Sequence, residues 1–160
     1  MATMVETPGP IDQAITQSRL TFKELYLAFL GNPETVDITY GPMNCFLIHH
    51  PERRKEFVSK LLPPPGRPLN THQDFVERLL VSGKRTSPVD DHGRIRIEKV
   101  HLGWAGLEPN SQAFLMPREA YGWIEVWNEK GYYDSLRTTD DKWQTAITAL
   151  LETLQGERVH

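Results

Sequence analysis

Histidine and cysteine side chains are the first candidates for chemistry in this chain. A nucleophilic thiol needs a base beside it, and Cys45 has only the pair His49-His50 nearby in the sequence. Cys45 lies in an apolar run, so we interpret it as a buried thiol that packs as a small hydrophobic side chain. None of the six histidines pairs with another at the three- or four-residue spacing of helical metal ligands. We therefore expect no catalysis, no metal and no cofactor.

Two short basic segments could contact nucleic acid through charge. One is Arg53-Arg54-Lys55, which we interpret as the solvated start of a helix, where positive charge is unfavourable. Lys84 and Arg85 are better candidates. The formal net charge of −3 argues against a broad basic surface, so any such contact is expected to be local.

The chain contains two copies of one unit, which become visible when Arg19 is placed over Arg94. Apolar residues then match in both copies, and a glycine follows each set. The matched pairs are Leu20 with Ile95, Phe22 with Ile97, Leu25 with Val100, Leu27 with Leu102, Phe29 with Trp104 and Gly31 with Gly106. After a small shift they continue as Val36 with Ala113, Ile38 with Leu115, Phe46 with Ile124 and Ile48 with Val126. Each copy is predicted to form a strand, a short turn of helix and two more strands.

Alternating apolar and polar residues indicate the strands. In residues 94–98 the isoleucines are expected to face the core and the charged residues the solvent, and residues 36–40 alternate in the same way. Residues 123–127 are mostly apolar and are expected to be more buried. Residues 90–93, Asp-Asp-His-Gly, have the composition of a turn.

Three helices are predicted outside these strands. Residues 52–61 place Phe57, Val58 and Leu61 on one face, and the run Pro63-Pro64-Pro65-Gly66 ends this helix. A second helix begins at a cap formed by Thr71 and carries the apolar residues Phe75, Val76, Leu79 and Leu80. A third, over 139–154, is docked on the core or on a neighbouring subunit through Trp143, Ile147, Leu150, Leu151 and Leu154.

The segment from Asp90 to Leu107 carries a recognisable pattern. It reads Asp90-Asp91-His92-Gly93-Arg94-Ile95-Arg96-Ile97, followed by Ala105-Gly106-Leu107. This is similar to the MraZ family of bacterial DNA-binding regulators, whose motif runs Asp-x-x-Gly-Arg, an apolar alternation, usually Pro, a Leu-Arg pair and Ala-Gly-Leu. Residues 123–127 resemble that family's acidic-apolar-Trp strand, and residues 45–61 resemble its first-repeat strand and helix. The resemblance spans residues 15–133.

The resemblance implies an α+β fold in which two AbrB-like swapped-hairpin repeats form an intrachain pseudo-dimeric β-barrel. Helices would lie between the repeats and at the C-terminus. It also implies a transcriptional regulator that binds double-stranded DNA at promoter repeats of a division and cell-wall gene cluster, as a homo-oligomeric ring. The implied DNA-binding residues are Arg19, Lys23, Arg94 and Arg96, to which Lys84 and Arg85 are added. Arginine pairs well with guanine edges and phosphates, and a ring multiplies weak contacts.

Both copies depart from the family pattern. In the first, Asp-x-x-Gly-Arg is replaced by residues 15–19, Ile-Thr-Gln-Ser-Arg, which keep only Arg19. Lys23 stands for the proline there and Leu27 for the later arginine. In the second, Glu98 stands for the proline and His101-Leu102 for the Leu-Arg pair. Without a glycine before Arg19, we expect a different turn at that point.

These departures leave three hypotheses. The chain binds DNA through the remaining basic residues, it binds a different DNA sequence, or it is a diverged paralogue that assembles with other proteins and no longer binds DNA. Arg94 could instead pair with Asp90 or Asp91, and Arg96 could be an ordinary solvated charge.

The repeat and the helices between its copies divide the chain into five parts. They are a flexible N-terminus at 1–10, a first repeat with its helix at 11–62, a linker and inter-repeat helix at 63–85, a second repeat at 86–133, and a C-terminal amphipathic helix with a tail at 134–160. No apolar run has the length of a membrane span, and the start of the sequence does not resemble a signal peptide. We expect a cytoplasmic, nucleoid-associated protein without membrane contact.

Overall fold

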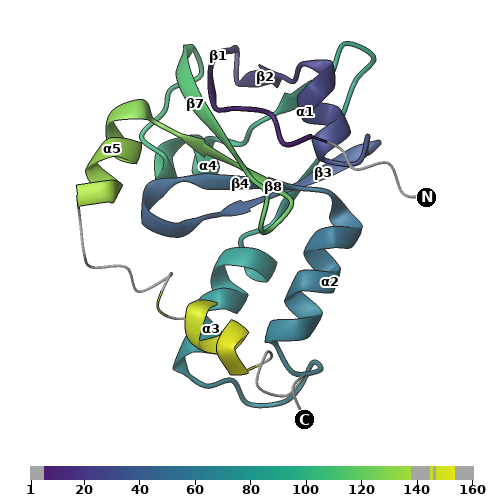
Figure 1. Ribbon diagram of the computed structural model, residues 1–160, viewed down its shortest axis with the longest axis vertical. Coiled ribbons are helices and arrows are strands. Elements are labelled where there is room, and N and C mark those ends of the chain that lie inside the picture. The colour runs from purple at the N-terminus through teal and green to yellow at the C-terminus, as the bar shows by residue number, and fades with distance from the viewer. Residues whose placement is uncertain (1–5, 138–144, 146, 154–160) are drawn as a thin grey trace.

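The computed structural model describes residues 6–137, 145 and 147–153, and it is built on one antiparallel sheet of eight strands. The sheet order is β5-β3-β4-β8-β7-β1-β2-β6, and the sheet curves into a nearly closed barrel (Figure 1). The strands are β1 Ile11–Thr16, β2 Arg19–Thr21, β3 Thr35–Tyr40, β4 Phe46–His49, β5 Arg85–Pro88, β6 Arg94–Arg96, β7 Ser111–Arg118 and β8 Trp123–Trp127. The α+β class and the barrel expected from the sequence are confirmed.

The two edge strands, β5 and β6, approach each other without forming a regular ladder. The backbone N–H of Arg96 donates to Ser87 Oγ at 3.0 Å, and the N–H of Asp90 donates to the carbonyl of Arg94 at 3.1 Å. These contacts satisfy backbone groups that an open sheet edge would leave exposed.

The helices lie around this barrel. They are α1 Glu24–Phe29, α2 Pro51–Leu61, α3 Thr71–Glu77 with a π-helical continuation η2 Arg78–Ser82, α4 Lys99–Trp104 and α5 Glu129–Arg137, and a 3₁₀ turn η1 spans Pro42–Asn44. Figure 1 shows α2 and α3 together on one side of the barrel. Residues 145 and 147–153 are also helical, whereas the rest of the predicted helix 139–154 lies outside the described residues. In the described part of the chain, no helix combines the length and the apolar character that crossing a membrane requires.

The same order of elements occurs twice along the chain, as strand, strand, helix, strand, strand. Two pairs of equivalent strands also lie side by side. Leu20 of β2 pairs with Ile95 of β6, and Leu47 of β4 pairs with Glu125 of β8. In each pair the two partners hold equivalent positions in the two copies, so a local two-fold relation passes through both contacts.

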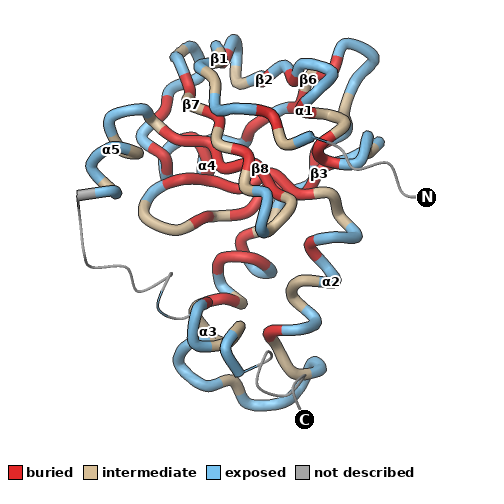
Figure 2. The backbone as a smooth tube through the Cα atoms, viewed as in Figure 1, coloured by how far each residue is buried: buried red, intermediate tan, exposed pale blue. Residues whose placement is uncertain are grey.

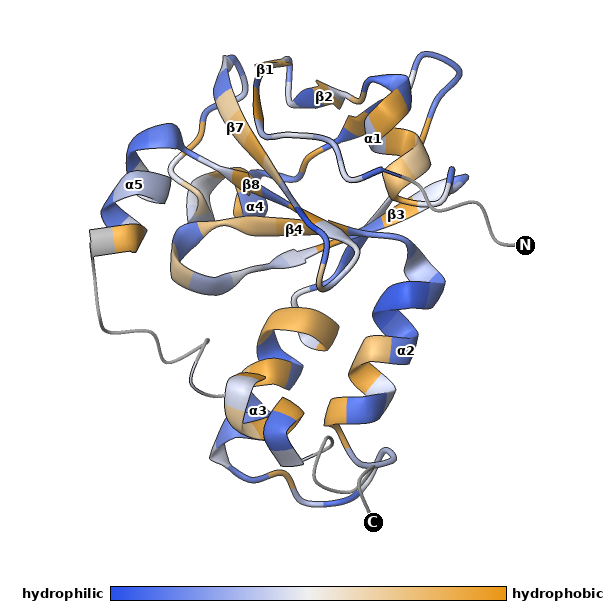
Figure 3. Ribbon diagram, viewed as in Figure 1, coloured by the Kyte–Doolittle hydropathy of each residue, from blue (hydrophilic) through white to orange (hydrophobic). Residues whose placement is uncertain are grey.

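Two apolar clusters fill the structure. One occupies the barrel interior, where alternate strand residues such as Ile38, Phe46 and Ile124 are at most 1% exposed. The second lies outside the barrel, where Leu47, Trp123 and Trp127 pack against α2, α3, η2 and the partly buried helical residues Leu150 and Leu151. Burial is concentrated in the strands and in the helix faces turned toward them, and these segments are also hydrophobic (Figures 2 and 3). The expected docking of the C-terminal stripe is confirmed for the described residues, with Ile147 only 2% exposed.

The alternation expected in β3 is wrong on one face. Asp37 and Thr39 were expected to face solvent, but they are 3% and 0% exposed because α2 and η2 cover that face. Arg54 of α2, expected to be solvated, is 6% exposed and forms an ion pair with Asp37, with Nε and Oδ2 2.7 Å apart. The two charges bury each other, so neither polar side chain marks a solvent-facing position.

The predicted cap of the second helix is wrong by one residue. Asn70, not Thr71, caps α3: its side chain accepts the Gln73 N–H at 2.8 Å, while the Gln73 side chain accepts the Asn70 N–H at 3.1 Å. Both Asn and Thr are good caps, and the reciprocal bond with Gln73 favours the register that starts at Asn70.

Candidate nucleic-acid-binding face

The outer face of the β2–β6 ladder gathers three of the predicted arginines. Leu20 and Ile95 pair at the centre of this ladder and point into the barrel, with exposures of 0% and 1%. Because side chains alternate along a strand, their neighbours point outward. Arg19 lies directly opposite Arg96, and Thr21 lies directly opposite Arg94.

Arg19 and Arg96 form a pair of like charges on this face. Both are exposed, and among the described residues neither forms an ion pair. Like charges directly opposite each other on one face of an antiparallel pair are destabilising. An anion placed between the two guanidinium groups would remove this repulsion, so the pair has the chemistry of a phosphate or carboxylate site.

Arg94 is already engaged by a turn aspartate. Its Nε lies 2.7 Å from Asp90 Oδ2, and the other Asp90 oxygen accepts the backbone N–H groups of His92 and Arg94, each at 2.9 Å. The Arg94 N–H and the other donors around it lower the pKa of Asp90 to about 2. Of the two partners considered from the sequence, Asp90 is therefore the one that holds Arg94 beside the ladder.

The turns before the two aligned arginines differ, as expected, but the missing glycine does not remove the left-handed conformation. Gln17 and Ser18, with φ of 52° and 62°, connect β1 directly to β2. Ser18 thus adopts the conformation of its equivalent Gly93, whose φ is 76°. The first turn is held from outside, because Asn110 Oδ1 accepts the Gln17 N–H and the Pro109 carbonyl accepts the Ser18 N–H, both at 2.9 Å.

The other three predicted residues lie apart from the ladder. Lys23 follows β2 as the exposed N-cap residue of α1, and its equivalent before α4 is Glu98. Arg85 is the first residue of β5, at the far end of that strand from the Asp90 turn. Its guanidinium donates to the carbonyl of Lys84 at 2.9 Å. Burial lowers the pKa of His101 in α4, and the charge of Arg85 adds to this effect. The structure therefore brings Arg19, Arg94 and Arg96 together, and it does not bring Lys84 and Arg85 to the same face.

A polar site that was not expected from the sequence lies between β7, β8 and α5. There Arg118 Nη1 donates to Glu125 Oε2 at 2.8 Å beside a cavity of about 310 Å³. In the sequence, the feature that could have revealed this site is the single carboxylate in the otherwise apolar run Trp123-Ile124-Glu125-Val126-Trp127. All five residues of this run are buried.

No model of a known protein family matches this chain, and no curated protein matches it. The assignment of a function therefore depends on the residues of the two copies and on the geometry of these two sites.

Proposed function

We propose that this chain is a sequence-specific DNA-binding transcriptional regulator of the MraZ type, built as an AbrB-like swapped-hairpin pseudo-dimer. The strand order supports this architecture. β1 of the first copy pairs with β7 of the second, and β5 of the second copy pairs with β3 of the first. Each copy thus contributes its first strand to the other, as an exchange of hairpins within one chain requires.

The observation that carries the proposed activity is the unpaired, exposed Arg19–Arg96 pair on the outer face of β2 and β6 in the described part of the chain. Two guanidinium groups held in one ladder can bind adjacent phosphates or a phosphate and a guanine edge. Arg94 adds a third positive group whose orientation is fixed by Asp90. This face lies at the contact between equivalent strands, so a two-fold-related DNA element would meet similar groups from both copies.

The small number of basic residues makes each contact weak. Each neutralised phosphate contributes about 0.9 to the slope of log affinity against log salt, so two or three arginines predict a slope of about −2 to −3 per chain. Assembly into a homo-oligomeric ring on promoter repeats would compensate by multiplying the contacts.

The test is fluorescence anisotropy with the promoter of the protein's own operon at several salt concentrations. Arg19→Ala and Arg96→Ala are each expected to weaken binding about tenfold and to reduce the salt slope by about one. Arg67→Ala, which removes an exposed arginine between α2 and α3, is the matched control and should change neither quantity. Absence of salt-sensitive binding at micromolar protein, with a normal circular dichroism spectrum, would refute the proposal.

A protein-binding assembly module is the second candidate, and one pair of exposed apolar residues favours it. Leu25 of α1 and Val100 of α4 hold equivalent positions in the two copies, and they are 50% and 48% exposed. Exposed apolar residues at related positions suit contacts between protein subunits. Light scattering combined with size exclusion, and a pull-down from the host, would test this function. A monomer that captures no partner would count against it.

A further inference from the structure

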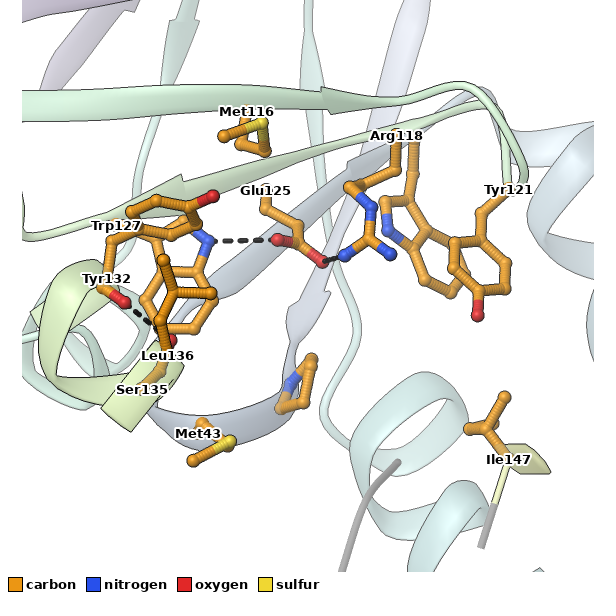
Figure 4. A pocket seen from close by; sticks show the side chains of 12 residues that line it. Met43, Met116, Arg118, Tyr121, Glu125, Trp127, Tyr132, Ser135, Leu136 and Ile147 are labelled. Atoms are coloured by element: carbon orange, nitrogen blue, oxygen red, sulfur yellow. Dashed lines mark hydrogen bonds and ion pairs between the residues drawn. The ribbon is translucent and has the colours of Figure 1, made fainter. Parts of the chain in front are cut away.

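The cavity of about 310 Å³ beside β7 and β8 has walls of mixed chemistry. Figure 4 shows Glu125 between Arg118 and Trp127, with Met43 and Ile147 on the opposite side of the space. Tyr121 closes the end beside Arg118, where its ring stacks on that of Trp123 with 4.4 Å between the centroids. An aromatic and apolar cavity with a few convergent polar groups is the usual form of a small-molecule site.

Glu125 is the unusual residue of this wall. It is 2% exposed, and its two carboxylate oxygens accept one N–H each, from Arg118 at 2.8 Å and from the Trp127 indole at 2.9 Å. Burial raises its pKa, and Arg118 only partly opposes this effect. Removing a carboxylate from water costs several kcal/mol unless its partners compensate.

The equivalent position in the first copy carries no carboxylate. Leu47 is the equivalent residue in β4, it pairs directly with Glu125 across the two-fold contact, and it is 0% exposed. A leucine therefore fulfils the structural requirement in one copy. The carboxylate in the other copy, with the arginine that accompanies it, calls for a role beyond packing.

The groups still available for a ligand are donors. The Arg118 side chain is 39% exposed and uses only one guanidinium nitrogen for Glu125. The Trp123 indole N–H is buried and forms no hydrogen bond of normal geometry in the described part of the chain, and its weaker interaction with Glu125 helps to lower the pKa of that carboxyl group. A ligand that satisfies these donors must bring acceptor oxygens, and the surrounding rings and methionines favour an apolar body.

We propose that this cavity binds a small carboxylate with an aromatic or similarly planar apolar body. Its carboxylate is held by Arg118 and the Trp123 N–H, and its body lies against Trp127 and Met43. Glu125 orients Arg118 for this contact through the ion pair. An amine gains little at the site, because both oxygens of Glu125 already accept hydrogen bonds and Arg118 balances its charge.

The test uses the full-length protein labelled with ¹⁵N and three probes of equal size: 3-phenylpropionate, 3-phenylpropanamide and 3-phenylpropylamine. The chain has four tryptophans, so their indole N–H signals can be assigned by substitution. The carboxylate should shift the Trp123 indole signal in a saturable way, with at least tenfold higher affinity than the amide or the amine. Equal affinity for the carboxylate and amide, preference for the amine, or no saturable shift at millimolar carboxylate would each overturn the proposal.

Variants separate ligand binding from folding. Trp123→Phe keeps an aromatic ring but removes the indole N–H together with the five-membered ring, and it should weaken carboxylate binding by about five- to tenfold, read from intrinsic fluorescence. Glu125→Gln removes the negative charge beside the bound carboxylate and keeps an oxygen that accepts from Arg118, so it should strengthen binding of the carboxylate. Arg85→Gln, which changes an exposed arginine near α4, is the matched control and should leave binding unchanged. If both pocket variants remain folded and bind the carboxylate like the parent protein, the assignment of these residues is wrong.

Discussion

Replacing Arg54 by methionine should lower the free energy of unfolding by about 3 to 5 kcal/mol. Arg54 joins α2 to the barrel through the ion pair with Asp37, and the two side chains are only 7% and 4% exposed. Methionine fills much of the same volume, so the loss comes from the uncompensated carboxylate rather than from a cavity.

The magnitude follows from the contacts that the substitution removes. Asp37 loses its partner at 2.7 Å and, among the described residues, keeps the Thr86 hydroxyl, which donates to its other oxygen at 2.9 Å. The carbonyl of Leu80 loses the Arg54 Nη1 donor at 3.2 Å. Unsatisfied buried polar groups cost about 1 to 3 kcal/mol each, and more when charged, which agrees with the stated range.

The assay is urea denaturation at pH 7.5 of Arg54→Met, Asp37→Asn and the double variant. The introduced asparagine would keep an acceptor for Thr86 and carry no charge, so the double variant should lose at least about 1.5 kcal/mol less than the sum of the single variants. Arg78→Met is the matched control. It breaks an ion pair of 2.9 Å with Asp74 in which the two side chains are 73% and 50% exposed, and it should have little effect. Additive single losses, or a loss below about 1 kcal/mol for Arg54→Met, would refute the reasoning.

Three further predictions concern His49, Ser18 and Cys45. Burial lowers the pKa of His49 from 6.5 to about 3. The positive charge of Arg54 adds to this effect, and the negative charge of Asp37 partly opposes it. Between pH 6.5 and 3 the unfolded state therefore binds a proton that the folded state does not. The free energy of unfolding should fall by about 1.4 kcal/mol per pH unit as the pH decreases through this range. Urea titrations at pH 7.5, 5.5 and 4.5 should show a shallower decline in His49→Gln than in the parent protein. Ser18→Gly should raise the free energy of unfolding by a few tenths to about 1 kcal/mol, because Ser18 has a φ of 62°, and a denaturation midpoint that is unchanged or lower would contradict this. Burial, and secondarily the charge of Glu125, raise the pKa of Cys45, which is 0% exposed. Its thiol should therefore react with Ellman's reagent only as fast as the protein unfolds. Rapid labelling of the native protein would show that the reagent reaches Cys45 in the folded state.

The parts of the fold that were predictable are those in which one strand or helix carries its own signal. The apolar run at 123–127 is buried at every position, and Phe57, Val58 and Leu61 lie on the inward face of α2. The α5 helix was not expected, and Gly131 in its first turns weakens the helical pattern. A local sequence pattern is sufficient to predict a strand or helix only where local propensity and burial agree.

The remaining features depend on partners that are distant in the sequence. Nothing near Asp37 or Arg54 distinguishes a buried charge from a solvated one, and only the packing of α2 on β3 does so. The conformation of Ser18 depends on Pro109 and on Asn110 in the loop before β7. The arginines of the ladder were identified from the repeat, but their register, with Arg19 opposite Arg96, requires β2 and β6 to pair.

The two copies also indicate where function has been added to a shared framework. Leu20 and Ile95 are equivalent, paired and buried alike, which is what a common barrel requires of both. Leu47 and Glu125 are equivalent and paired but differ in chemistry, so the buried carboxylate that lines the cavity belongs to the second copy alone. The arginine ladder lies on β2 and β6, and β1 separates β2 from β7 in the sheet. Loss of Arg19 should therefore leave carboxylate binding intact, loss of the Trp123 N–H should leave the DNA face intact, and each proposal can fail without the other.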